Sequence, residues 1–296
     1  MKEMIKSGLR AARAEMSKED KIWSRYSNDK VDIGETLAKV IRTLTRALPL
    51  SRDLRALSIG SSDEPQFRIL ETMFRGGLYL LDIEKSALDI VRERVHRQYT
   101  DHVRAVVGDY RKLFLRQGNA EAFLKTELAG QRVDLITLHH SLYYLDETQW
   151  LSLFENLFGT LLAPKGAVHA VLMSSESENP CSTTWLYNHF AGKFFGHRND
   201  QNLLRFKRKL HKNPSFRNTQ VLSRTSLVKC FVNDFEKLME VVWMILLYPN
   251  VHPYSLKQRE EITEHIYKKF WKKKRPLLQQ QDHLAVYRGI NFKGLI

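Results

Sequence analysis

The sequence predicts an α/β protein with a doubly wound, mostly parallel sheet and helices on both faces of that sheet. Between residues 55 and 172, five short apolar runs alternate with segments of helical periodicity. Strands that are buried on both faces of a parallel sheet are typically such apolar runs. The 296 residues, 43% of them hydrophobic, are enough for one large core with an added lobe.

The first 50 residues are predicted to be helical and to precede the sheet. Asp32 and Glu35 have the spacing of a capping box. Apolar side chains then recur at helical spacing until Pro49, where a helix would have to end.

Strands and helices are expected to alternate after this segment. The five expected strands are Arg55–Ile59, Leu78–Asp82, Val103–Val107, Val133–Leu138 and Ala167–Leu172. Asp146 and Gln149 form a second capping pattern, with Leu145 and Trp150 placed as a hydrophobic staple. Pro164–Gly166 is expected to turn the chain into the fifth strand. Such βα repeats connect by right-handed crossovers.

The pattern changes after the fifth strand and predicts fewer, longer elements. A strand is expected at Val221–Phe231 and a helix at Asp234–Leu247. Ser255 and Gln258 have the spacing to cap a further helix. A last strand is expected at Leu284–Tyr287.

These elements divide the chain into three parts. Residues 1–50 form a helical segment, 51–175 a ligand-binding core, and 176–296 a helical and basic insertion or cap with the last strands. No window approaches the roughly 18 unbroken apolar residues of a membrane span, and the first residues lack the apolar region of a secretory signal. Cys181 and Cys230 form neither a disulfide framework nor a zinc motif. We therefore expect a cytoplasmic protein.

The chain is strongly basic, with a formal net charge of +14, which favours an anionic partner. Residues 203–212 and 266–276 interleave Lys and Arg with aromatic residues, as nucleic-acid-binding surfaces do. The alternative is that the rings belong to the core and the cations to the solvated face. In the second segment, Phe270 continues an apolar stripe from Ile262, which favours this alternative.

The turn after the first expected strand contains acids where a dinucleotide site would have glycines. In "LSIGSSDEPQFRIL", Gly60 is followed by Ser61–Glu64 and then by Pro65, which has no N–H to donate. Each acid would repel a diphosphate by about 1 kcal/mol or more. The same acids suit a cationic ligand such as S-adenosylmethionine, which has a sulfonium, an ammonium and a ribose. The alternative is that Asp63 only caps a helix over Pro65–Phe74.

The next two strand ends extend this pattern. Asp82 ends the second strand about twenty residues after Gly60, where a carboxylate can accept both hydroxyls of a ribose. The third strand ends at Gly108 and Asp109. A glycine-containing first turn followed by these two acids resembles the class I S-adenosylmethionine-dependent methyltransferases, over residues 55–172. The resemblance implies a Rossmann-like sheet with a reversed final strand.

The resemblance also implies a set of cofactor-binding residues. The first turn would contact the methionine part, Asp82 the ribose, and Asp109 the adenine amino group. The set expected to hold S-adenosyl-L-methionine is Gly60, Ser61, Ser62, Asp63, Asp82, Ile83, Gly108, Asp109, Tyr110 and His139. Ser62 and Glu64 stand where the family has its second and third turn glycines.

The fourth strand end carries the residues expected to face the acceptor. In "LITLHHSLYYLDETQW", His140 and Tyr143 are the predicted catalytic pair, since methyl transfer needs alignment of the nucleophile and often removal of a proton. Histidine is a natural base near neutral pH. The alternative is that the tyrosines cover the cofactor. Adjacent histidines on a strand point to opposite faces, so His139 is expected to pack inward. We expect no metal site.

Together these residues predict methyl transfer to a nitrogen or oxygen atom of a small molecule, with the basic charge favouring an anionic acceptor. Past the fifth strand, Glu176 could bind an amine, close to Trp185, Tyr187 and His189. Two alternatives stay open. One is an RNA methyltransferase that uses the basic segments. The other is a binding protein that kept the fold and lost catalysis, because Glu64 replaces a turn glycine.

Overall fold

The computed structural model describes the chain as two compact units. It describes residues 2–12, 16–49, 51–60, 66–247 and 252–290. One unit, here called the helical unit, consists of Met1–Asp32, Met173–Gln201 and Thr225–Gln281. The other, the sheet unit, consists of Ile33–Leu172, Asn202–Arg224 and Asp282–Ile296. Each unit is assembled from segments far apart in the chain, whereas the sequence-based division follows the chain.

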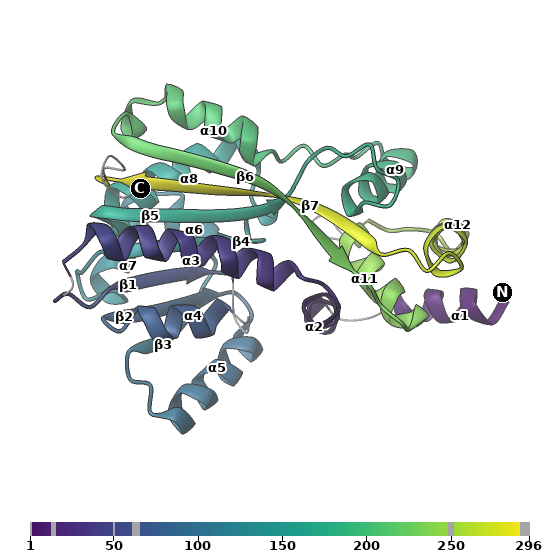
Figure 1. Cartoon of the computed structure of the whole chain (residues 1–296), viewed down its shortest axis with the longest axis horizontal. Coiled ribbons are helices and arrows are strands. Elements are labelled where there is room, and N and C mark those ends of the chain that lie inside the picture. The colour runs from purple at the N-terminus through teal and green to yellow at the C-terminus, as the bar shows by residue number, and fades with distance from the viewer. Residues whose placement is uncertain (1, 13–15, 50, 61–65, 248–251, 291–296) are drawn as a thin grey trace. The chain divides into compact units, whose positions relative to one another are not determined.

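A seven-stranded sheet runs in the order β3-β2-β1-β4-β5-β7-β6 (Figure 1). The strands are β1 Arg55–Ile59, β2 Gly77–Asp82, β3 Val103–Val107, β4 Val133–His139, β5 Leu162–Met173, β6 Thr219–Cys230 and β7 Leu277–Arg288. β1 pairs in parallel with β2 on one side and β4 on the other, and β3 and β5 extend the parallel part outward. The strand order therefore reverses between β1 and β4, where ligand crevices form in open α/β sheets.

β7 runs opposite to β5, as the resemblance implies. The N–H of Ser174, just past the end of β5, donates to the carbonyl of Gln280 near the start of β7. At the other end, a Cβ at Gly289, just past β7, would lie 2.3 Å from the carbonyl oxygen of Pro164 near the start of β5. The predicted last strand is thus confirmed and is longer than expected.

The predicted turn at Pro164–Gly166 is wrong, because these residues lie inside β5. β5 begins at Leu162, which pairs with Val133, and the register then shifts before Leu135. Such an irregularity accommodates a proline that cannot donate to the ladder.

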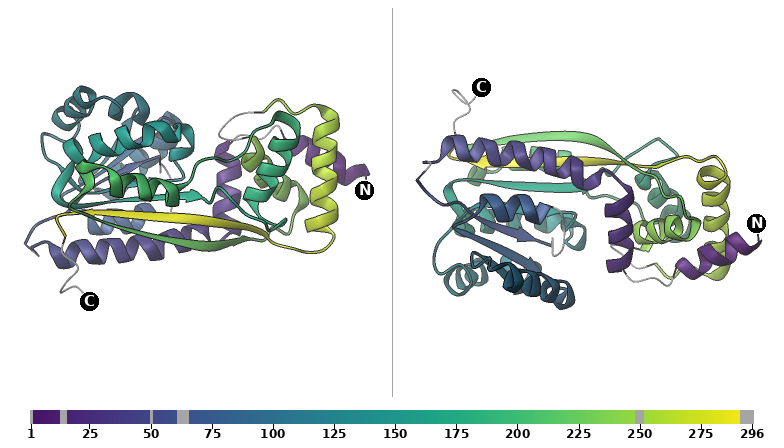
Figure 2. Two further views of the ribbon diagram at one scale, coloured as in Figure 1. Left: turned by 90° about the horizontal axis from the view of Figure 1, so that it is seen from above. Right: turned by 60° about the horizontal axis from the view of Figure 1, so that its bottom comes forward.

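Helices pack on both faces of the sheet (Figure 2). One face is covered by α3 Asp29–Ala47, α4 Gln66–Met73 and α5 Lys85–Gln98, which bury Leu44, Leu70 and Leu88 against alternate strand residues such as Ala56 and Leu80. The other face is covered by α6 Tyr110–Phe114, α7 Gln117–Thr126, α8 Trp150–Asn156 and α10 Leu203–Lys212.

The turns before α8 follow the predicted capping pattern in part, because Gln149, the N-cap of α8, forms no side-chain capping hydrogen bond. Asp146 caps a 3₁₀ turn, Glu147–Gln149, by accepting a hydrogen bond from the Thr148 N–H. Leu145 and Trp150 are both buried, and the indole of Trp150 donates to the Leu145 carbonyl. A second 3₁₀ turn, Leu142–Tyr144, precedes this one, and π-helical turn Leu157–Leu161 follows α8. The short 3₁₀ turn Pro214–Phe216 follows α10.

The helical unit has its own aromatic core. Its helices are α1 Lys2–Ala11, α2 Met16–Tyr26, α9 Thr183–Phe195, α11 Phe235–Leu247 and α12 Leu256–Ile266, the last continued by π-helical turn Tyr267–Trp271. α11 packs against α1, α2 and α9. The predicted capping box of Ser255 and Gln258 is present at the start of α12. In the part of the chain that the structure describes, no helix is long and apolar enough to cross a membrane.

The predicted capping box at Asp32 is wrong. α3 begins at Asp29, so Asp32 lies within the first helical turn. Its carboxylate accepts hydrogen bonds from the Ser226 hydroxyl and the Gln281 amide instead. These partners are about 200 residues or more away along the chain, so local spacing could not indicate them.

Candidate functional site

The turn after β1 requires glycine at its first position. Gly60 has a φ of +72°, and a Cβ there would lie 2.7 Å from the Cβ of Ser141. No side chain fits that space, and the left-handed backbone is costly for other residues. The Gly60 N–H donates to the Leu81 carbonyl at 2.8 Å, which ties the ends of β1 and β2 together. Ser61, Ser62 and Asp63, like Glu64 and Pro65, lie outside the described residues.

Asp82 ends β2 as predicted and is half-buried at the same edge of the sheet. Its Oδ1 accepts the N–H of Glu84 at 2.9 Å. The next side chain, Ile83, is 58% exposed, which is unusual for a large apolar residue. The N–H of Gly108 donates to the Asp82 carbonyl at 2.8 Å, so the end of β3 is bound to the end of β2.

Asp109 forms hydrogen bonds and an ion pair with Arg111. Asp109 caps α6, and its Oδ1 accepts from the backbone N–H and Nε of Arg111 at 3.0 and 2.9 Å. Its Oδ2 accepts from the guanidinium at 2.8 Å. The hydrogen bond from Arg111 lowers the pKa of the Asp109 carboxyl. The carboxylate predicted to meet an adenine therefore also braces the turn after β3.

Tyr110 braces the loop after β4 from the same turn. It is 9% exposed, and its hydroxyl donates to the Ser141 carbonyl at 2.9 Å. Burial raises the pKa of Tyr110, so the hydroxyl remains a neutral donor. Tyr110 was predicted to contact the cofactor; the structure places its hydroxyl against the backbone of the loop.

The two histidines at the end of β4 differ in their surroundings. His139 is 1% exposed, and its Nε2 lies 2.9 Å from Nδ1 of His169 on β5. His140 is half-buried and has a φ of +52°. Its Nδ1 lies 3.1 Å from the Tyr143 hydroxyl, and the two rings stack nearly in parallel. The structure thus brings the predicted catalytic pair together and packs His139 inward.

Ser141 is a residue whose role the sequence did not reveal. It is 3% exposed, and its hydroxyl has no hydrogen-bond partner among the described residues. Leaving a buried hydroxyl unpaired costs about 1–3 kcal/mol, so such groups commonly mark a position where a ligand or water binds. Its neighbour on the turn after β1 is Gly60. No sequence signal separates Ser141 from an ordinary loop serine.

No metal centre is present in the described ranges, where no three His, Cys, Asp or Glu side chains are grouped to hold an ion.

One phenylalanine in each basic segment belongs to the core. Phe206 is fully buried and packs edge-on against Trp150 and Phe154. Phe270 is 1% exposed. These two rings are not available to stack on bases, whereas Tyr267 and Trp271 are half-buried, so nucleic-acid binding by the two segments stays a prediction.

The cations of α10 are partly used within the sheet unit. Arg205 and Lys209 both pair with Glu147, which is nearly buried. These hydrogen bonds lower the pKa of the Glu147 carboxyl against the effect of its burial. Phosphate binding by the other cations of the segment stays a prediction.

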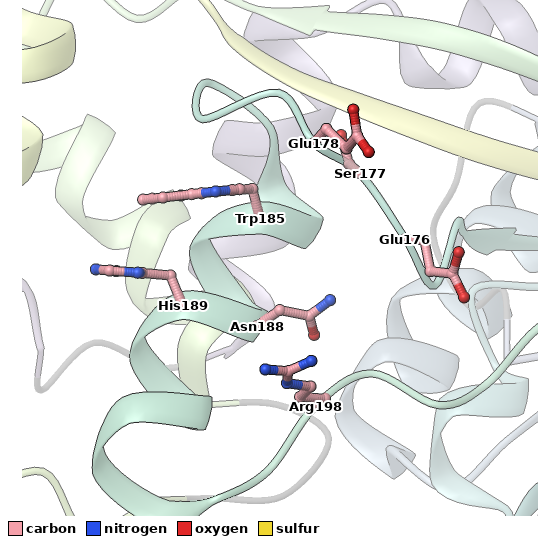
Figure 3. Close-up of a pocket in the computed structure, with 7 residues that line it drawn as sticks. All are labelled: Glu176, Ser177, Glu178, Trp185, Asn188, His189 and Arg198. Carbon is pink, nitrogen blue, oxygen red and sulfur yellow. The ribbon is translucent and has the colours of Figure 1, made fainter.

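The residues singled out after β5 lie in the helical unit. Glu176, Trp185 and His189 line a cavity there (Figure 3). Tyr187 is buried instead, with its hydroxyl 3.2 Å from Nε2 of His252.

Comparison with solved structures identifies the fold. The YcgJ protein from Bacillus subtilis matches with a TM-score of 0.52 and 11% identity, over 83% of this chain and 95% of its own. A candidate methyltransferase from Bacillus halodurans matches with a TM-score of 0.52 and 12% identity, over 86% of this chain and all of its own. A candidate sarcosine dimethylglycine methyltransferase from Galdieria sulphuraria matches with a TM-score of 0.50 and 13% identity, over 87% of this chain and 86% of its own.

No protein-family model matches the chain, and no curated protein sequence matches it. The chain nevertheless has the fold of the class I S-adenosylmethionine-dependent methyltransferases, with their strand order and reversed last strand. The resemblance predicted from the strand-end residues is confirmed at the level of the fold.

Proposed function

We propose that the chain transfers a methyl group from S-adenosylmethionine to a nitrogen or oxygen atom of a small molecule. The observation that carries this proposal is the approach of Gly60 to Ser141, at the point where the strand order reverses, next to an acid that ends β2. The bare backbone at Gly60, the buried Ser141 hydroxyl and the Asp82 carboxylate lie together at this edge of the sheet. They suit a ligand that has an ammonium and a ribose and lacks phosphate.

The described residues fit the cofactor. The missing side chain at Gly60 leaves the β1 turn open to close backbone approach. Asp82 would accept the ribose hydroxyls, and the exposed Ile83 offers an apolar surface for the adenine. Asp109 would accept the adenine amino group, because a carboxylate has about four acceptor sites and Arg111 uses three. The Ser141 hydroxyl would find its partner in the ligand.

The bound cofactor would supply a methyl group on a sulfonium, which is already a good leaving group. His140 and Tyr143 would act on the acceptor. A neutral imidazole has one donor and one acceptor nitrogen. When Nδ1–H donates to the Tyr143 oxygen at 3.1 Å, Nε2 becomes the nitrogen that takes a proton from an O–H or N–H acceptor. The strained backbone at His140 fixes the ring in this position, as strain often does at functional sites.

The cofactor part of the proposal is tested by calorimetry with S-adenosylmethionine and its demethylated product. We expect both to bind, and Asp82→Asn to weaken binding about tenfold through loss of charge-assisted hydrogen bonds. Asp101→Asn is the matched control, because Asp101 is an exposed acid in the loop before β3. Absence of binding, or equal affinity of the two variants, would overturn the cofactor assignment.

The transfer step is tested by incubating the chain with labelled cofactor and pooled metabolites. We expect labelled products that are lost with His140→Ala and reduced about tenfold or more with Tyr143→Phe. Tyr99→Phe is a suitable control, because Tyr99 is an exposed tyrosine at the end of α5. Tight cofactor binding without any product would instead identify a binding protein that has lost catalysis.

A further inference from the structure

A cavity of about 340 Å³ in the helical unit is lined by side chains of both charges (Figure 3). Glu176 and Glu178 come from the segment between β5 and α9. Trp185 and Asn188 come from α9, and Arg198 from the segment that follows it. This size lies within the range of pockets that hold small molecules.

The charged side chains of the cavity are not neutralised within the helical unit. Glu176 and Glu178 are exposed, and neither forms an ion pair with any residue that the structure describes. The same holds for Arg198 within the described ranges. Two free carboxylates are notable in a chain with a net charge of +14, since a lysine or arginine partner would be easy to supply.

The aromatic side of the cavity is formed by Trp185 and His189, whose rings extend away from Glu176 and Glu178 (Figure 3). The rings of Trp185 and His189 stack at 4.4 Å with an angle of 11°. Burial and Lys193 lower the pKa of His189, and burial with His189 lowers that of His265, behind Trp185, to about 4. Both shifts favour the neutral form of the imidazole, so the positive charge of the cavity comes from Arg198.

Asn188 holds the acidic and basic sides of the cavity in fixed positions. Its amide donates to the carbonyl of Ser175 at 3.2 Å, next to Glu176. Its carbonyl oxygen accepts the N–H of Asn199 at 2.7 Å, next to Arg198. One side chain thus connects both charged segments, which reduces the entropy lost when a ligand binds.

We infer that this cavity binds a small zwitterion of amino-acid type. The ammonium group would lie against Glu176 and Glu178, and the carboxylate would pair with Arg198. A simple anion would meet two carboxylates, and a simple cation would leave Arg198 unpaired. Binding at this cavity does not depend on methyl transfer, so the inference stands apart from the proposed function.

Three matched probes test this inference on the full chain without a methyl donor. Phenylalanine has both charged groups, phenethylamine lacks the carboxylate, and 3-phenylpropionate lacks the ammonium. Their common ring gives a signal for ligand-observed NMR titration. We expect phenylalanine to bind about threefold more tightly than phenethylamine, and both to bind more tightly than 3-phenylpropionate, because exposed ion pairs contribute modestly.

Two variants test which side chains bind the ammonium group of the ligand and which bind its carboxylate. The double variant Glu176→Gln with Glu178→Gln should weaken the binding of phenylalanine and of phenethylamine about tenfold. Arg198→Gln should remove the preference for phenylalanine and leave phenethylamine unchanged. The control is Glu35→Gln with Glu260→Gln, two exposed glutamates outside the cavity that change the net charge equally. The inference is overturned if 3-phenylpropionate binds as tightly as phenylalanine, or if the cavity and control double variants behave alike.

Discussion

The two ends of the same strands in the sheet unit are built in opposite ways. At the amino end, the fully buried Asp134 pairs with Arg52 and accepts the backbone N–H of Arg55. The Arg55 guanidinium donates to the Tyr79 hydroxyl and to the Leu128 carbonyl. At the carboxyl end, by contrast, the buried Ser141 hydroxyl has no partner in the part of the chain described. Left-handed backbone occurs at both ends, at Gly60 and His140 here and at Ala129 and Gly130 in the loop before β4.

This difference distinguishes the end of the sheet that contributes most to stability from the end that carries the candidate site. At the amino end, Asp134 and the terminal nitrogens of Arg55 have several partners, so these groups stabilise the fold, although Nε of Arg55 is buried without a partner among the described residues. Strained and unpaired groups cost about 1–3 kcal/mol each, and folds retain them where a function requires them. A perturbation at the amino end should therefore reduce stability, and one at the carboxyl end should reduce ligand binding.

The largest expected effect is that of Gly60→Ala. The added Cβ would lie 2.7 Å from Ser141, on a backbone with a φ of +72°. Left-handed backbone costs alanine about 1–2 kcal/mol, and relief of the clash must move the β1 turn or the loop after β4. We expect the affinity for S-adenosylmethionine to fall about a hundredfold, measured by calorimetry.

Gly130→Ala is the control for this substitution. Gly130 has a φ of +73°, but a Cβ there would meet nothing within 4 Å. It should cost similar backbone strain and leave cofactor affinity unchanged. If the two variants lose affinity equally, the close approach of Gly60 to Ser141 has no part in binding.

Asp134→Asn should produce the next largest effect, on stability. It replaces one of the two carboxylate oxygens, which accept from Arg52 and from the Arg55 N–H, by an amide NH₂ group that cannot accept a hydrogen bond in this buried position. We expect the free energy of unfolding to fall by about 2 kcal/mol, measured by denaturant titration. Cofactor affinity should be unchanged where the variant is folded. Asp82→Asn should instead weaken cofactor binding and leave the free energy of unfolding unchanged. A loss of affinity with unchanged stability at Asp134 would remove the distinction between the two ends.

The strands of the sheet were predictable because burial on both faces leaves a continuous apolar signal. β1 and β3 begin and end where the sequence predicts. The start of β5 was not predictable, because pairing with β4 overrides the turn preference of Pro164 and Gly166. The same limit applies to Asp32, whose partners are distant in the chain.

The site was predictable only in its placement. Gly60, Asp82 and His140 lie at strand ends, and topology brings strand ends together. The roles of Ser141 and Tyr110 depend on a contact between loops that are 31 residues apart, which no local pattern encodes. The pairing of Asp109 with Arg111 is local, but two-residue spacing of opposite charges is too common to be a signal.

A smaller effect is expected for Tyr110→Phe, which sharpens the comparison at the carboxyl end. The substitution removes only the hydroxyl that donates to the Ser141 carbonyl. We expect the free energy of unfolding to fall by about 1 kcal/mol, the value of one buried hydrogen bond. Cofactor affinity should fall about threefold, because the loop after β4 loses a support. Tyr287→Phe is a control in a buried tyrosine of β7. Equal affinity of both variants would show that Tyr110 has no positioning role.

The smallest expected effect is a difference in titration between the acids of the two ends. The hydrogen bond from Arg111 lowers the pKa of Asp109, whereas burial raises that of Asp134. Asp109 thus contributes stability that is present above its ordinary pKa and is lost as the pH falls through the lowered value. Asp134 contributes in the opposite sense, since stability falls as the pH rises from its ordinary pKa through the raised value. Carboxyl-carbon NMR should therefore show Asp134 releasing its proton at a higher pH than Asp109. The reverse order would mean that Arg52 and Arg55 outweigh the burial of Asp134, so that its charged form is the stable one at the amino end.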